Sequence, residues 1–397
     1  MQCATAGSID SDGQQAVNEA FSSLVDELGA PPDIVFFYAT VDYDVAEINA
    51  TLAELVGDAS IHGGTSCQGA MTQQGMFGEE GRGLALMGMR DPKGSYGVGI
   101  ESIDGDPKSA ASAAVRAALA DSGRVGEMPQ LIWVTAEPGA EEDLISGIEA
   151  VLGPNVPILG GSAADNDVSG KWYQFANGEV RSGAIVVTAM FPSGEVGFSF
   201  HSGYEPTSHR GKITRADDRI LYEIDGRPAA QVYDEWTGGT ISEEREAGGN
   251  VLAKTSLHPL GREVGQLEGT SYFQLSHPDG VREDGALTLF SRVEEGDELV
   301  CMTGTVDSLT SRAGRVAQAA LETTFREKEE VAGALIIYCA GCMLTVQDRI
   351  NDVADGLNEA LGGKPYLGTF TFGEQGCFIG GENRHGNLMI SVVTFYQ

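Results

Sequence analysis

Three short stretches rich in glycine and hydroxyl side chains have the composition of ligand-binding loops. Each follows an apolar run, and in α/β units ligands sit beyond the carboxyl ends of strands, where loops expose backbone N–H groups. The stretches lack the lysine of a phosphate-binding loop and the glycine spacing of a dinucleotide site. The alternative is that the glycines only let repeated units pack closely. The loop residues predicted to line a small-molecule pocket are Gly63, Gly64, Thr65, Ser66, Cys67, Gly160, Gly161, Ser162, Asp165, Thr371, Phe372 and Glu374.

Two further candidates are Cys339 and Cys342, which form a Cys-x-x-Cys motif directly after an apolar run. This placement permits a thiolate near a helix start, or half of a metal site. A second Cys-x-x-Cys is absent from the sequence, although Cys67 and Cys377 could converge on the first. The alternative is two small residues in a tight bend. An enzyme would use Cys342 or Cys67 as nucleophile with a histidine as base.

Glu374 is a carboxylate flanked by glycines, and it could bind an amine such as an amino-acid ammonium group. The alternative is that it caps a neighbouring loop. The six histidines form no close ligand pair, so metal-dependent hydrolysis is unsupported. A single axial haem ligand needs no spacing, and His62 and His209 are the candidates for it. Because no nucleophile elbow is present either, binding is favoured over catalysis.

A repeated unit must position these loops. The apolar runs Ile34–Tyr38, Leu131–Thr135 and Leu335–Tyr338 are each followed by a helical stretch and then by one of the loops. The distance from Ile34 to Gly63 equals that from Leu131 to Gly160. An Asp-containing segment and a helix precede each run, and another apolar run follows each loop. Self-similarity of this kind predicts duplicated α/β units.

The unit reads strand, helix, strand, helix, Gly loop, strands, and it recurs over residues 1–90, 96–190 and 299–397. The first helix of the third copy is predicted over Ala313–Phe325. The fold class is therefore α/β (or α+β), with mixed sheets flanked by helices. We expect one domain over residues 1–195, with two units, and a second over 196–397. The second contains an inserted segment, 196–298, and the third unit.

The chain of 397 residues is strongly acidic, with 58 Asp and Glu against 25 Lys and Arg and a formal net charge of −33. Nucleic acids and anionic membrane surfaces are therefore poor partners. No apolar run is long enough to span a membrane. The N-terminal residues lack the basic and apolar regions of a signal peptide. We expect a cytoplasmic protein with reduced cysteines.

Several motifs together resemble the FIST family, in which a FIST N domain precedes a FIST C domain. They are Gly63–Gly69, Pro157–Ala163, Leu221–Ala229, Pro278–Gly280, Glu295-Gly296, Cys339–Cys342, Thr369–Gly376 and His385–Asn387. The resemblance implies a sensory module that binds a small molecule, such as an amino acid, and acts in signal transduction. It also implies a haem-based nitric oxide sensor as an alternative. The family often has Arg where Cys342 stands here, so an anionic ligand group would be recognised differently.

The family's sensory domains are usually wired to output domains, and none is recognisable in this sequence. The resemblance therefore implies that the signal passes to a separate partner protein, such as a histidine kinase or a cyclase.

Overall fold

The computed structural model describes residues 1–267, 269–378 and 380–397. Three six-stranded mixed sheets share one strand order. The first contains β1 (Gln2–Ser8), β6 (Leu84–Arg90), β2 (Ile34–Ala39), β3 (Ser60–Thr65), β10 (Gln174–Ala176) and β11 (Glu179–Arg181). The second contains β7 (Ser95–Ser102), β12 (Ala184–Phe191), β8 (Leu131–Ala136), β9 (Ile158–Ser162), β25 (Glu374–Cys377) and β26 (Asn383–Gly386). The third contains β13 (Val196–Ser202), β27 (Met389–Tyr396), β23 (Val331–Cys339), β24 (Tyr366–Thr371), β4 (Ala70–Thr72) and β5 (Gly75–Phe77).

The last two strands of every sheet form a hairpin borrowed from another unit. The β10–β11 hairpin of the second unit pairs with β3 of the first, and β25–β26 of the third pairs with β9 of the second. The β4–β5 hairpin of the first unit pairs with β24 of the third and closes the cycle. Each sheet is therefore completed by a neighbour, and the loops that end β3, β9 and β24 are drawn together.

Each sheet has one face on a shared central core and the other under its own helices. The central core contains Phe36, Trp133 and Ile337, one from each unit. Because both faces are covered, the central strands are continuously apolar, as the sequence indicated. The covering helices are α1 (Gly13–Leu28), α2 (Val45–Val56), α3 (Pro107–Asp121), α4 (Glu141–Leu152), α8 (Val306–Glu322) and α10 (Ile350–Leu361).

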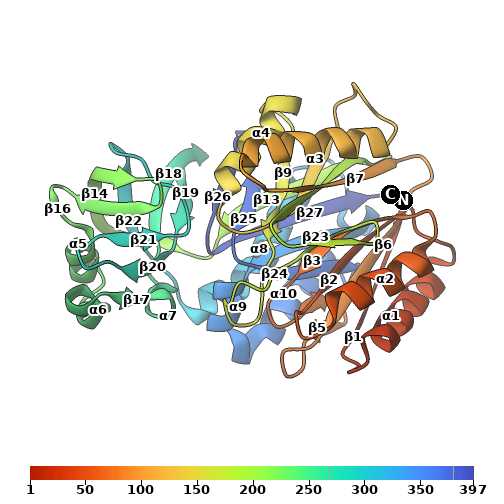
Figure 1. Cartoon of the computed structure of the whole chain (residues 1–397), viewed down its shortest axis with the longest axis horizontal. Helices are drawn as coiled ribbons and strands as arrows, with labels where there is room; N and C mark the ends of the chain where they lie inside the picture. Colours follow the sequence, from red (N-terminus) through yellow and green to blue (C-terminus); the bar gives the residue numbers. More distant parts are fainter. Residues whose placement is uncertain (268, 379) are drawn as a thin grey trace.

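The fourth sheet lies in residues 203–304, which we call the insert and which forms one end of the elongated molecule (Figure 1). Its strands are β14 (Glu205–Asp217), β15 (Ile220–Ile224), β16 (Arg227–Pro228), β17 (Gly249–Asn250), β18 (Leu260–Leu267), β19 (Thr270–Ser276), β20 (Pro278–Val281), β21 (Leu287–Leu289) and β22 (Glu298–Thr303). Its helices are α5 (Ala229–Trp236), α6 (Ser242–Ala247) and α7 (Leu252–Thr255), and α9 (Ala340–Thr345) follows β23 in the third unit. The structure confirms the mixed α/β class and the three related units.

The third unit differs from the predicted one in two places. We predicted that it begins at Leu299, but Leu299 lies in β22 of the insert, and β13 takes the place of the first strand by pairing with β27. The predicted helix start at Ala313 was also wrong, because α8 begins at Val306 with a Thr305 cap. From here on, unit 1 is residues 1–90, unit 2 is 96–190, and unit 3 is β13 plus 305–397. Within the described residues, no helix has the length and apolar content to cross a bilayer.

Candidate functional site

A cavity of about 580 Å³ lies where unit 2, unit 3 and the insert meet. Unit 2 contributes Glu141 and Trp172, the insert contributes Arg219 and His277, and unit 3 contributes Cys339. Apolar side chains form most of the remaining wall. Its volume falls within the range of small-molecule sites, which combine apolar walls with a few placed polar groups.

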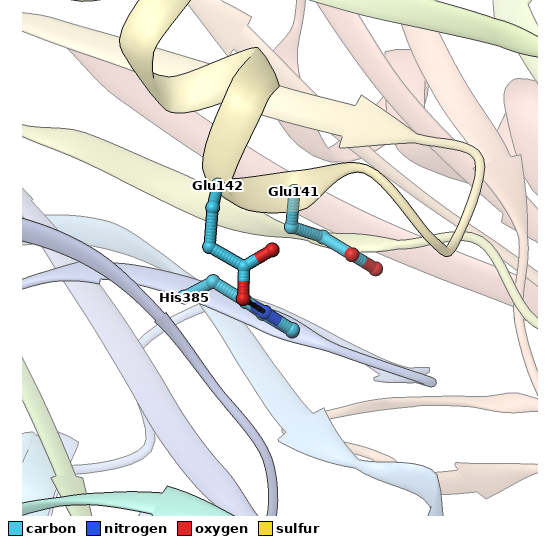
Figure 2. Close-up of side chains that lie close together, drawn as sticks. All are labelled: Glu141, Glu142 and His385. Atoms are coloured by element: carbon cyan, nitrogen blue, oxygen red, sulfur yellow. Dashed lines mark hydrogen bonds and ion pairs between the residues drawn. The ribbon is translucent and has the colours of Figure 1, made fainter. Parts of the chain in front are cut away.

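The polar side of the cavity is built on the first turn of α4. The residue before this helix, Ala140, makes no side-chain cap among the described residues, and the first turn is acidic, with Glu141, Glu142 and Asp143. Carboxylates in this position interact favourably with the helix dipole. Figure 2 shows Glu141 and Glu142 extending from the start of α4, with Glu142 beside His385 of β26. Arg219 and Arg292 of the insert pair with the three acids. The helix start is therefore free to bind groups from other parts of the chain.

Glu141 has a full set of hydrogen-bond donors although its side chain is only 2% exposed. It accepts from the backbone N–H of Gly139 at 3.1 Å, from Ser162 Oγ at 2.8 Å and from Arg219 at 2.6 Å. Burial acts to raise the pKa of Glu141, but the charges of His385 and Arg219 lower it by more. The pKa of Glu141 therefore lies below its ordinary value. Glu141 is consequently an ionised, fully paired carboxylate at neutral pH.

Glu142 joins the same network from the next position. Arg219 donates to it at 2.7 Å and His385 Nδ1 lies 3.1 Å from it, while the backbone N–H of Arg292 donates at 2.8 Å. Burial lowers the pKa of His385, but Glu141 and Glu142 raise it more, so the net shift is upward. For Glu142, burial acts to raise the pKa, but His385 and Arg219 outweigh it and the net pKa is lowered. These ion pairs connect unit 2 to both the insert and unit 3.

Glu141, Glu142 and His385 also have the spacing of a metal site, because one ligand atom of each lies within 4.8 Å of the others. Arg219 nevertheless bonds to both carboxylates. Its guanidinium supplies the positive charge that a metal ion would bring. The cluster therefore fits a protein ion-pair network better than a metal centre.

The connection between β9 and β10, residues 163–173, carries part of the cavity wall. Asp165 is buried and accepts hydrogen bonds from the backbone N–H groups of Val168 at 2.6 Å and Lys171 at 2.9 Å. These bonds fold the loop so that Val168 and Trp172 both line the cavity. Asp165, predicted to contact a ligand, thus orders the loop that presents the lining residues.

Two residues predicted from the sequence, Cys339 and Phe372, line the cavity directly. The predicted glycines lie in β3 and β9, and two of them make close backbone contacts. A Cβ on Gly63 would lie 1.9 Å from Phe37 O, and one on Gly160 would lie 2.0 Å from Val134 O. The remaining predicted loop residues surround them and are buried: Gly64, Thr65, Ser66, Cys67, Gly161, Ser162 and Thr371. Close packing accounts for the two glycines, and a ligand role for these residues stays a prediction.

Glu374, Cys67 and Cys342 are buried and do not line the cavity, whereas Cys339 is buried and does. Glu374 accepts from Thr371 Oγ1 and the backbone N–H of Met389, both at 3.0 Å, and burial raises its pKa well above the ordinary value. Burial likewise raises the pKa of Cys67 to about 12 and that of Cys339 well above its usual range. A buried neutral thiol is a weak nucleophile. These residues therefore suit packing and hydrogen bonding better than thiol catalysis.

Neither histidine predicted as a haem ligand fits that role. His62 is buried in the central core, and its two ring nitrogens lie 2.7 Å from Thr188 Oγ1 and 2.9 Å from Thr135 Oγ1. Burial lowers the pKa of His62 to about 3, so its ring is neutral. His209 lies on the surface strand β14, stacked against Trp236. A haem bound by His62 would have to break that residue's hydrogen bonds, and a haem bound by His209 would lie outside the cavity.

Four central residues of this site were not predicted from the sequence as site residues: Glu141, Glu142, Arg219 and His277. The available signal was the acidic triplet at a helix start that has no capping residue. His385 and Asn387 did appear in a motif, and Asn387 lines the cavity. Their partners come from distant segments, and sequence spacing alone does not show that.

Comparison with known proteins supports the motifs noted in the sequence. Residues 33–227 match the family model of the FIST N domain, and residues 229–377 match that of the FIST C domain. FIST domains are associated with sensing in signal transduction. An uncharacterized protein of Methanocaldococcus jannaschii is 32% identical over 143 residues, which is 35% of this chain and 26% of that protein. The match thus spans about a quarter of the relative's length.

Two similar solved structures are cyanuric acid hydrolases. One, from A. caulinodans, aligns with a TM-score of 0.41 and 9% identity over 100% of this chain and 99% of its own. A second aligns with a TM-score of 0.37 and 8% identity over 99% of each chain. At these values the likeness is too weak to support an inference about this chain.

Proposed function

The chain belongs to the FIST family, and on that premise we propose that it is a cytoplasmic sensory module that binds a small molecule in the cavity beside Glu141. The observation that carries the proposal is the cavity itself, which has a suitable volume and is built from three separate parts of the chain. The family resemblance suggests an amino acid or a similar small molecule as the ligand. The output passes to a separate signalling protein, such as a histidine kinase or a cyclase.

The position of the cavity explains how binding would be transmitted. An occupant would contact α4 and the Trp172 loop of unit 2, β23 and α9 of unit 3, and the insert at the same time. A ligand shifts a conformational equilibrium only when it interacts differently with the two states. A cavity between three bodies meets this condition, because its walls move apart or together whenever the bodies do.

Filling the cavity tests the proposal. Ala253 is exposed and lines the cavity, so Ala253→Trp should occupy its space. Ala50→Trp, at an exposed position on α2, is the matched control. Native mass spectrometry on the full chain, purified from its own host, should show a bound small molecule in the wild type and in Ala50→Trp, with loss in Ala253→Trp.

A thermal shift completes the test, because a ligand at about 100 times its Kd stabilises the folded state by roughly 2.7 kcal/mol. Each molecule found by mass spectrometry is added back to the wild type and to both variants. The proposal would be contradicted if the wild type carried no bound molecule, or if a molecule that was found gave no thermal shift. Equal binding by Ala253→Trp and Ala50→Trp would also contradict it.

A further inference from the structure

The cavity wall carries balanced charge. Among the described lining residues, Glu141 and Arg219 are the ones charged at neutral pH, and they pair with each other at 2.6 Å. His277 and Cys339 also line the cavity and are neutral, because burial lowers the pKa of the histidine to about 4 and raises that of the thiol. A charged ligand would therefore lose its hydration without gaining an unpaired counter-charge.

The walls and the mouth are apolar and aromatic. Trp172 and Phe372 meet edge to face with ring centroids 5.8 Å apart, and His277 and Phe290 do so at 6.0 Å. Val168 and Leu344 line the cavity yet remain 48% and 40% exposed. Apolar surface left in water is unfavourable, and a bound apolar ring would cover it.

The hydroxyl groups of the wall are available as acceptors. Ser256 donates its proton to the carbonyl of Leu252 at 3.1 Å, and Thr345 donates to that of Gly341 at 2.7 Å. Each hydroxyl has one proton and two lone pairs, so each oxygen keeps the capacity to accept from a ligand. A ligand complementary to these hydroxyl oxygens therefore has a hydrogen-bond donor.

These three observations point to one ligand class. Building on the function proposed above, we infer that the cavity binds an uncharged aromatic ring that carries an N–H or O–H donor, the class of which indole is the simplest probe, in preference to a free amino acid. The ring would lie between the walls formed by Trp172 and His277, with its donor towards a wall hydroxyl. A zwitterion brings two charges, and within the described part of the chain the wall has no unpaired charged group for either.

A matched set of probes tests this class by isothermal titration calorimetry on the full chain. Indole is neutral, indole-3-acetate is an anion, tryptamine is a cation, tryptophan is a zwitterion, and 1-methylindole lacks the N–H donor. Indole should bind, and each charged analogue should bind at least about tenfold more weakly, which corresponds to roughly 1.4 kcal/mol. 1-Methylindole should also bind more weakly than indole.

The possible outcomes separate the ligand class from the proposed function. Tighter binding of a charged analogue than of indole, or no binding of indole, would overturn the class. If mass spectrometry nevertheless finds a ligand that Ala253→Trp excludes, the sensory proposal stands while this inference fails. Equal affinity for indole and 1-methylindole would overturn the requirement for a donor.

A change of charge in the wall gives a second test, because it should alter which probe the cavity prefers. Arg219→Met leaves Glu141 and Glu142 with His385 as their remaining cation, so the cluster becomes net negative at about pH 6. Tryptamine should then gain affinity relative to indole. Arg215→Met removes an exposed ion pair with Glu223 and is the control.

Trp172→Leu covers the case in which Arg219→Met does not fold, because it alters the wall and leaves the ion pairs intact. It should weaken indole binding and leave the order of the probes unchanged. An unchanged ratio of tryptamine affinity to indole affinity in a folded Arg219→Met, or undiminished indole binding in Trp172→Leu, would overturn the inference.

Discussion

Helices α2 and α4 occupy the same place in units 1 and 2, but they begin differently. Asp44 caps α2 by accepting from the backbone N–H groups of Ala46 and Glu47, both at 3.1 Å. In the part of the chain that the structure describes, no side chain caps α4, and its first turn carries three acids. Arg219 and Arg292 of the insert bind those acids. One copy of the helix start is closed locally, whereas the other has become the docking site of the insert.

The difference shows how a repeated fold acquires a single site. A local cap stabilises its own helix and needs no contact with distant parts of the chain. An acidic first turn needs cations from elsewhere, and here these arrive on the insert that forms another wall of the cavity. The loss of a cap and the gain of a binding site therefore occur at the same position.

Arg219→Met should have the largest effect, because it leaves Glu141 and Glu142 buried without their shared partner. Breaking a buried ion pair costs about 3–5 kcal/mol. The urea midpoint of unfolding should fall accordingly. Arg215→Met, which disrupts an exposed pair with Glu223, should cost about 0–1 kcal/mol. Equal losses of stability in the two variants would show that the α4 cluster contributes no more than an exposed ion pair does.

Asp165→Ala should follow in size. The connection after β9 spans residues 163–173 in unit 2, whereas residues 66–69 suffice in unit 1, and Asp165 orders the longer one. Leaving its backbone donors without an acceptor should cost about 1–3 kcal/mol. The acrylamide quenching of Trp172 fluorescence should also rise. Asp167→Ala changes an exposed carboxylate in the same loop and should do neither. Similar quenching in the two variants would contradict the role of Asp165.

His385→Asn should have a smaller, pH-dependent effect. The raised pKa of His385 means that its contribution to stability is fully present below its ordinary pKa, about 6.5, and is lost as the pH rises through the higher folded value. The difference between wild type and variant should therefore shrink from pH 6 towards pH 9. His209→Asn, at an exposed histidine outside the α4 cluster, is the control. A difference that grows with pH would contradict the pairing with Glu142.

Asp44→Ala should have the smallest effect, about 1 kcal/mol, because it removes a local cap and no long-range contact. Binding in the cavity should be unchanged. Glu54→Ala, at an exposed position of the same helix, is the control and should leave the thermal midpoint nearly unaltered. A loss as large as that of Arg219→Met would show that α2 is also an anchoring point.

The comparison also shows what the sequence could and could not predict. Periodicity and caps are local, so the repeated units and the range of α2 followed from the sequence. The first strand of unit 3 did not, because β13 and β22 are both short apolar strands and only pairing with β27 distinguishes them. The central residues of the cavity were missed for the same reason. Cys339 and Phe372 follow their own strands, whereas Arg219 reaches Glu141 across the fold.

The cyclic exchange of hairpins described above has a consequence for how this chain could have arisen. Each unit lends a hairpin to one neighbour and receives one from the other, so among the described residues no unit completes its own sheet. Three identical copies could satisfy the same pairings around a closed ring, as a trimer with head-to-tail contacts does. Joining the copies in one polypeptide removes the need for identity. Each corner of the ring is then free to diverge, and in the part of the chain that the structure describes the insert lies at one corner.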